Sequence, residues 1–141
     1  MTSRDYHHSK AVAWHEASHW AVASELGLKP LSVHADGSGG AVRIAPSETV
    51  SSDGRRRMVA LYLAGHLGEQ MRYGAMPLLT PNSEDYKVVD RLLMALPSQE
   101  ERVTMQSEAM DLAARALRER WDFVKVLAAE LQERGRWSVV A

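Results

Sequence analysis

Residues 15–19 read His-Glu-Ala-Ser-His, a set of side chains whose spacing can bind a metal ion and activate water. Positions four residues apart lie on one face of an α-helix, so His15 and His19 can bind the same zinc ion. Glu16 projects from the adjacent part of the turn, where it can accept a proton from water. This HExxH pattern predicts zinc-dependent hydrolysis of peptide bonds, with Glu16 as the catalytic base. The alternative is two histidines on a partly buried helix face that bind no metal.

A catalytic zinc site needs a third protein ligand besides the two histidines. The sequence has no cysteine, so this ligand must be a histidine or a carboxylate. Five residues are candidates: Glu69, Asp85, Glu84, Asp90 and His66. Asp85 is attractive because it starts a predicted helix directly after a constrained Pro-Asn loop. Glu69 is the rival, because its helix is expected to pack against the first one, and spacing alone does not choose between them.

Length and composition predict a single globular domain over residues 1–141. Hydrophobic residues make up 45% of the chain and charged residues 25%, which is ordinary globular usage. The formal net charge of −1 gives no reason to expect binding to nucleic acid. No apolar run approaches the roughly 20 residues of a membrane span. No signal-peptide pattern follows the first residues, so we expect a soluble, cytoplasmic protein.

The segments around the motif predict a helix followed by a hairpin. Good helix formers surround the motif and predict a helix from residue 9 to residue 26, ended by Gly27 and Pro30. Residues 31–35 and 41–45 are short alternating runs on either side of a glycine-rich turn, which predicts a β-hairpin. No other segment resembles a strand. The predicted fold class is therefore mainly α with a small sheet (α+β).

The next predicted helix is capped by Ser52 or Asp53 and runs to Tyr73. Gly65 and Gly68 within it predict close packing against a neighbouring helix, because they carry no side chain to hold the backbones apart.

The C-terminal half of the chain is predicted to be helical. Ser83 is the expected N-cap of a helix through residue 95, after a loop over residues 77–82. Ser98 starts a helical region that reaches residue 134, as one helix or as two joined near Met110 or Trp121. An apolar stripe in this region is expected to belong to the core: Leu112, Leu117, Trp121, Val124, Leu127 and Leu131.

Four segments resemble, in the same order, the peptidase domain of FtsH, a family of AAA-type membrane zinc proteases. Residues 13–22 resemble its HEAGHA-type helix, and residues 31–44 its following hairpin. Residues 63–74 resemble its GGRAAEELxFG helix, and residues 82–89 its loop and helix with an N-D-L-x-x-A signature. The resemblance implies a helical zincin-like domain, in which the HExxH helix precedes a small sheet and a C-terminal helical region.

The resemblance also implies roles for individual residues. It implies that His15, His19 and Asp85 bind Zn²⁺. It implies that Glu16 is the general base. Glu69 falls on an acidic position of the family pattern, where it would orient a ligand histidine, with direct ligation as the less favoured alternative.

The chain departs from the family pattern in several places. Ser18 stands in place of a glycine, and His66 stands in place of an arginine and is interpreted as a polar helix residue. No ATPase module, Walker sequence or membrane segment precedes the motif. The expected activity is that of a zinc metalloendopeptidase that needs no ATP and cleaves accessible or unfolded polypeptides. Two partners remain as alternatives: a separate ATPase and a second copy of this chain.

An extended substrate is expected to bind by strand addition along the hairpin edge at Ala41, Val42, Arg43 and Ile44. Two other functions stay open. One is a zinc-binding regulatory protein without proteolytic activity, against which the retention of Glu16 argues. The other is a helical domain that binds no metal, which requires Asp85 to lie far from both motif histidines.

Overall fold

The computed structural model describes residues 3–36, 39–74 and 83–139, with side chains from residue 10 onward. It is 70% helical, with a small antiparallel sheet, which confirms the predicted mainly α (α+β) fold class. The elements follow one another in this order: α1 (Ser3–Glu25), β1 (Pro30–Asp36), β2 (Gly39–Ile44), α2 (Ser52–Tyr73), α3 (Glu84–Met94), α4 (Gln99–Glu119), α5 (Trp121–Arg134) and β3 (Arg136–Ser138).

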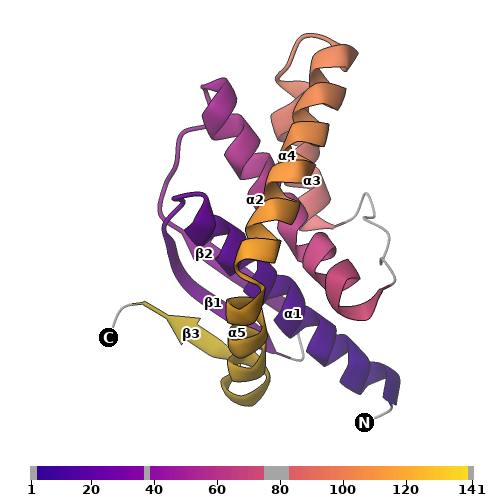
Figure 1. Cartoon of the computed structure of the whole chain (residues 1–141), viewed down its shortest axis with the longest axis vertical. Helices are drawn as coiled ribbons and strands as arrows, with labels where there is room; N and C mark the ends of the chain where they lie inside the picture. Colours follow the sequence, from indigo (N-terminus) through magenta and orange to yellow (C-terminus); the bar gives the residue numbers. More distant parts are fainter. Residues whose placement is uncertain (1–2, 37–38, 75–82, 140–141) are drawn as a thin grey trace.

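Helix α1, which carries the motif, lies at the centre of the molecule (Figure 1). Helices α2 and α5 and the sheet pack around it, so residues 16–23 are all buried. The helix begins at Ser3, six residues before the predicted start, because neither glycine nor proline interrupts residues 3–8. It ends at Glu25, just before Gly27, which has a φ of 75°. Glu16 and His19 of the motif are therefore buried, whereas His15 is half-buried.

The contact between α1 and α2 is close because Ser18 on α1 faces Gly68 on α2. A Cβ at Gly68 would overlap with Ser18 Oγ and would lie 2.5 Å from Ser18 Cβ. Gly65, one turn earlier, packs against the His15 ring in the same way. The two helices therefore pack closely at both glycines, as the sequence predicted.

We expect Gly68→Ala to lower the free energy of unfolding by about 1–3 kcal/mol, the usual cost of forcing a methyl group into a filled core. Urea unfolding followed by circular dichroism measures this change. Adding Ser18→Gly should recover part of the loss, because it removes the facing Cβ. Ser18→Ala should recover less, since it removes the overlapping Oγ but keeps that Cβ. Equal stability of Gly68→Ala and the wild type would contradict the observed contact.

The sheet has three strands in the order β2-β1-β3, all antiparallel. The predicted hairpin forms β1 and β2, and Val33 and Ala35 of β1 face the core. The prediction that no other segment forms a strand was wrong, because β3 pairs with β1 after Gly135 reverses the chain with a φ of 78°. Within the described part of the chain, β2 has a neighbour on only one side, so its outer edge can accept another strand.

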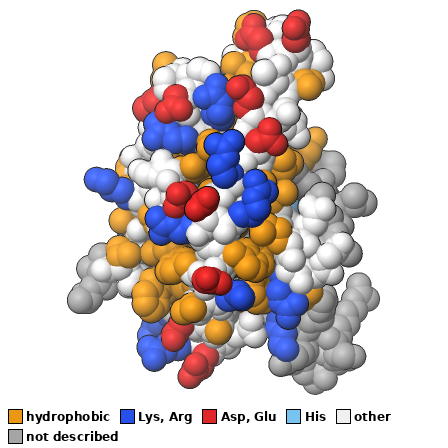
Figure 2. Space-filling model, in the orientation of Figure 1, with side chains coloured by type: hydrophobic (Ala, Val, Ile, Leu, Met, Phe, Trp, Pro, Cys, Tyr) orange, Lys and Arg blue, Asp and Glu red, His pale blue; other side chains and the backbone are white. Residues whose placement is uncertain are grey.

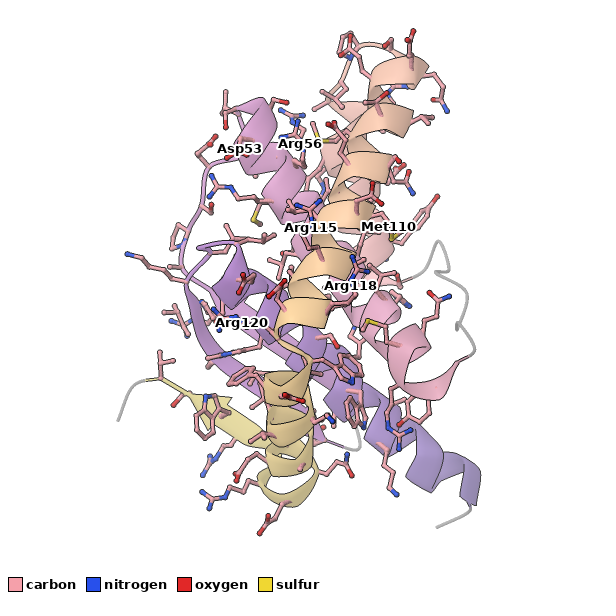
Figure 3. The ribbon with its side chains drawn as sticks, viewed as in Figure 1. Asp53, Arg56, Met110, Arg115, Arg118 and Arg120 are labelled. Atoms are coloured by element: carbon pink, nitrogen blue, oxygen red, sulfur yellow. The ribbon has the colours of Figure 1, made fainter. Side chains whose placement is uncertain are left out.

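The C-terminal region forms two helices that meet at Arg120 (Figure 3). The predicted joint near Trp121 is therefore confirmed, and a joint near Met110 is wrong, because α4 passes through Met110 without a break. Four of the six residues in the predicted stripe are buried, and Leu112 and Trp121 are half-buried. The Trp121 ring packs against Trp14 of α1, with ring centroids 5.5 Å apart.

Serine caps fix where α2 and α3 begin. The N-cap of α2 is Ser51, whose Oγ accepts a hydrogen bond from the Gly54 N–H at 2.9 Å, so the prediction of Ser52 or Asp53 was wrong by one or two residues. Ser83 caps α3 as predicted and accepts from the Tyr86 N–H at 3.0 Å. The predicted loop over residues 77–82 cannot be compared, because residues 75–82 lie outside the described residues.

The surface in Figure 2 mixes positive and negative side chains over its upper half, while apolar side chains gather lower down, across α5. At the start of α2, Arg56 lies 3.7 Å from Asp53, and Arg57 lies 3.1 Å from the same carboxylate (Figure 3). Among the helices described, none has a stretch both long and apolar enough to cross a lipid bilayer.

Candidate metal site

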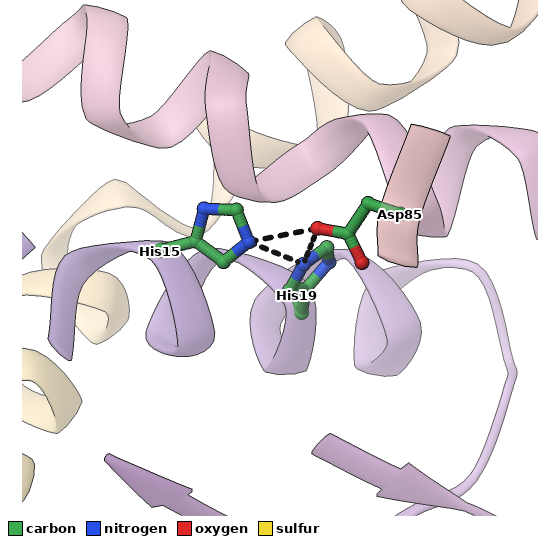
Figure 4. A group of neighbouring side chains, drawn as sticks. All are labelled: His15, His19 and Asp85. Atoms are coloured by element: carbon green, nitrogen blue, oxygen red, sulfur yellow. Dashed lines mark hydrogen bonds and ion pairs between the residues drawn. The ribbon is translucent and has the colours of Figure 1, made fainter. Parts of the chain in front are cut away.

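His15, His19 and Asp85 meet at one point between α1 and the start of α3 (Figure 4). His15 Nε2 lies 2.8 Å from Asp85 Oδ2, and His19 Nε2 lies 3.0 Å from the same oxygen. The two Nε2 atoms are 3.0 Å apart. Two residues from one helical turn and a carboxylate 66 positions beyond His19 are thus brought together by the fold.

The other ring nitrogen of each histidine has an acceptor as its partner. His19 Nδ1 lies 2.7 Å from the Leu61 carbonyl oxygen, which can only accept, so this nitrogen carries a proton. His15 Nδ1 lies 2.7 Å from Glu69 Oε1 and donates to that carboxylate. Both Nε2 atoms are therefore left to direct lone pairs toward Asp85. Partners of this kind commonly fix and orient histidines that bind metals.

Three electron-rich atoms that converge in this way need a cation between them, either a proton or a metal ion. Zinc forms tetrahedral sites with bonds of about 2.0–2.1 Å to nitrogen and oxygen, which places neighbouring ligand atoms about 3.3 Å apart. The observed separations of 2.8–3.0 Å approach that value and need to widen by only a few tenths of an ångström. The donor set of two imidazoles and one carboxylate fits a catalytic zinc site.

Protonation is the alternative way to neutralise this cluster. Burial alone would lower the pKa of His15, but hydrogen bonds to Asp85 and Glu69 outweigh it and raise the pKa to about 10. Burial alone would raise the pKa of Asp85, but its contacts with the His15 and His19 side chains hold it well below its usual range. In the metal-free protein, His15 is therefore the cation of the site at neutral pH.

We expect zinc binding near pH 7 to release about one proton per ion, because the metal displaces the proton of His15. The raised pKa of His15 stabilises the metal-free fold below pH 6.5, and this contribution is lost as the pH rises toward 10. A zinc titration in weakly buffered solution with a pH indicator measures the release, and zinc added to buffer alone is the control. Binding of one zinc without any proton release would show that His15 is neutral beforehand.

Glu16 lies beside the converging atoms without joining them. Its Oε1 is 3.7 Å from His15 Nε2 and 3.9 Å from His19 Nε2, and the side chain is buried. Its Oε2 is buried and has no hydrogen-bond partner among the described residues. Burial raises the pKa of Glu16, although the charges of His19 and His15 oppose this shift. A buried carboxylate with a free oxygen next to a metal site is suited to accept a proton from water.

Two cavities flank Asp85, and residues of β2 line part of each. One, of about 300 Å³, is lined by His15, Glu69 and His66; the other, of about 250 Å³, is lined by His19, Tyr62 and Ile44. Glu16, Gly40, Glu84 and Asp85 border both cavities. A Cβ at Gly40 would lie 2.6 Å from Glu16 Cγ, so a glycine allows this strand to pass directly over the site.

The structure separates the candidates for the third ligand. Asp85 joins the two motif histidines, whereas Glu69 contacts the opposite nitrogen of His15 and is placed to orient that ring. Glu84 is exposed and pairs with Lys87, and Asp90 is also exposed. Neither belongs to the cluster found among the described residues.

Some parts of the site were missed at the level of the sequence. His66 was interpreted as a polar helix residue, but its ring lies edge to face against His15, with centroids 5.0 Å apart. Its position three residues before Glu69, on the same helix face, could have indicated this. The Leu61 carbonyl that holds His19 has no signal in the sequence, because any residue offers the same backbone group.

Comparison of the sequence with models of protein families gives no match, and comparison with curated proteins gives none either. The chemistry of the site is therefore inferred from its geometry.

Proposed function

We propose that this protein is a zinc-dependent metallopeptidase. The observation that carries the proposal is the convergence of three electron-rich atoms, from His15, His19 and Asp85, beside the buried carboxylate of Glu16. A site that only binds a structural metal has no need of a buried carboxylate at that position with one oxygen that no described residue hydrogen-bonds. The arrangement supports hydrolysis rather than metal binding alone.

The proposed roles follow from these contacts. His15, His19 and Asp85 would hold the ion, which supplies a Lewis acid that polarises a peptide carbonyl and makes water more acidic. Glu16 accepts the proton of the attacking water and returns it to the leaving amine. Glu69 and the Leu61 carbonyl keep the two imidazole rings oriented.

The substrate is proposed to be an extended polypeptide paired with β2. The edge strand that passes the site carries Ala41, Val42, Arg43 and Ile44. Three of these residues also line the cavity next to His19: Ala41, Val42 and Ile44. Pairing of backbone groups with such an edge selects for extended chains. Accessible or unfolded segments are therefore the proposed substrates, without a requirement for ATP in the cleavage step.

Membership of the FtsH peptidase family is part of the same proposal. Its support is the order of the four resembling segments together with the placement of Asp85 and Glu69 around His15. A separate ATPase or a second copy of the chain could deliver folded substrates, and either one is a proposed partner.

The test is to purify the protein, measure its metal content by elemental analysis and assay cleavage of an unfolded, fluorescently labelled casein. We expect about one zinc per chain and cleavage that stops after treatment with a chelator and returns when zinc is added. A tightly folded fluorescent protein is the control substrate and should stay intact. One bound zinc without any cleavage would favour the regulatory function, and no bound metal would overturn both.

A further inference from the structure

His66 has no role in the chemistry proposed above, yet it lines the same cavity as His15, Glu16 and Glu69. Its ring lies edge to face with the His15 ring, at 88° between the planes. Helix α2 therefore supplies Glu69, which orients His15, and one turn earlier presents a second imidazole to the cavity.

The surroundings of His66 indicate which of its nitrogens carries the proton. Nδ1 is buried and has no hydrogen-bond partner within the described part of the chain. An orphaned N–H donor is rarer in protein interiors than an acceptor with an unused lone pair. The proton is therefore placed on Nε2, on the other side of the ring. The side chain lines the cavity while its Nδ1 is buried, which leaves Nε2–H as the donor available to a bound molecule.

Donors are scarce in this cavity. Besides the two imidazoles and the Ser83 hydroxyl, its polar side chains are the carboxylates of Glu16, Glu69, Glu84 and Asp85, which can only accept when ionised. His15 already uses its Nδ1–H on Glu69. Carboxylates repel the negative charge that develops on the carbonyl oxygen of a peptide during hydrolysis, so the reaction needs a donor on this side of the bond.

We propose that His66 donates its Nε2–H to the carbonyl oxygen of the peptide bond being cleaved, and so acts as a catalytic residue. This inference rests on the proposed peptidase function. A neutral imidazole suits the role, because it supplies a directed donor without adding a charge next to the metal ligands. No bond to His66 forms or breaks; the hydrogen bond strengthens as the oxygen gains negative charge.

The test compares two probes on the zinc-loaded protein by calorimetry: a capped Ala-Leu-Ala peptide and its phosphonamidate analogue, whose tetrahedral anionic group imitates the charged oxygen. We expect His66→Ala to weaken phosphonamidate binding about 100-fold, which is the usual cost of removing one hydrogen-bond donor from a developing oxyanion. Binding of the peptide should weaken less than about threefold, because its carbonyl oxygen carries no full charge. His66→Gln should recover part of the loss, because its amide keeps a donor. The zinc content should be one per chain in every variant.

Tyr62→Phe is the comparison variant, because Tyr62 lies one turn earlier on α2, lines the neighbouring cavity and carries the alternative donor group. A selective loss in Tyr62→Phe instead of His66→Ala would overturn the proposal. Equal weakening of the binding of both probes would also overturn it, because it would show that His66 only packs in the site. Loss of zinc from His66→Ala would overturn it as well, because it would show that His66 is a metal ligand. A wild type that holds zinc but does not bind the phosphonamidate would refute the peptidase function, and the role of His66 with it.

Discussion

A Glu16→Gln variant is expected to keep its zinc and to cleave casein about 10³-fold more slowly than the wild type. Glutamine has the same shape, so the buried site and its three ligands are preserved, but the amide cannot accept a proton from water. Glu16 Oε2 has no hydrogen-bond partner among the described residues, so the substitution breaks no hydrogen bond of that atom there. Initial rates and zinc content, measured on the same preparation, check both halves of this expectation.

The matched control is Glu25→Gln, which neutralises a carboxylate at the end of the same helix. Glu25 accepts a hydrogen bond from Arg120 at 2.6 Å and lies outside both cavities, so the rate should stay within about twofold. A Glu16→Gln variant that cleaves at the wild-type rate would assign the base elsewhere. Loss of zinc from that variant would show that Glu16 is a ligand.

An Asp85→Ala variant is expected to fall from about one zinc per chain to almost none after dialysis. Two imidazoles cannot complete a site that needs three protein ligands, and the charge of Asp85 is the only anionic contribution to the cluster of ligands. Elemental analysis measures the change. Casein cleavage should disappear with the metal.

Asp90→Ala provides the control on the same helix, because Asp90 is exposed and lies outside the cluster. It should retain full zinc content. Glu69→Gln should weaken zinc binding by about 10–100-fold without abolishing it, as expected for a group that orients a ligand. If Asp85→Ala keeps its zinc while Glu69→Gln loses it, the ligand would be Glu69, the rival candidate from the sequence.

The parts of the fold that the sequence predicted well are those governed by local signals. Ser83 caps α3, Gly135 ends α5 and the spacing of His15 and His19 indicates a shared helix face, all of which depend on neighbouring residues. Helix α2 was harder to interpret, because it is covered by α1 on one side and α4 on another. Its buried residues, among them Val59, Leu63 and Ala64, therefore do not lie on a single helix face.

The completion of the site depends on contacts between distant segments. Glu69 lies 54 positions after His15, and Asp85 lies 70 positions after it. The sequence could narrow the third ligand to five candidates, but only the packing of α2 on α1 and of α3 on α2 places one of them at Nε2 and another at Nδ1. The short strand β3 was missed for a related reason: three residues carry too little alternation to indicate a strand before their partner β1 is known.

The stacked indoles of Trp14 and Trp121 give this molecule an internal optical reporter. Two tryptophans with centroids 5.5 Å apart couple their electronic transitions, and the contribution of this coupling to the circular dichroism is lost when the rings separate. Trp14 immediately precedes His15, and Trp121 is the first residue of α5. The same signal therefore reports, without any added label, whether the last helix of the chain stays docked on the helix that carries the histidines.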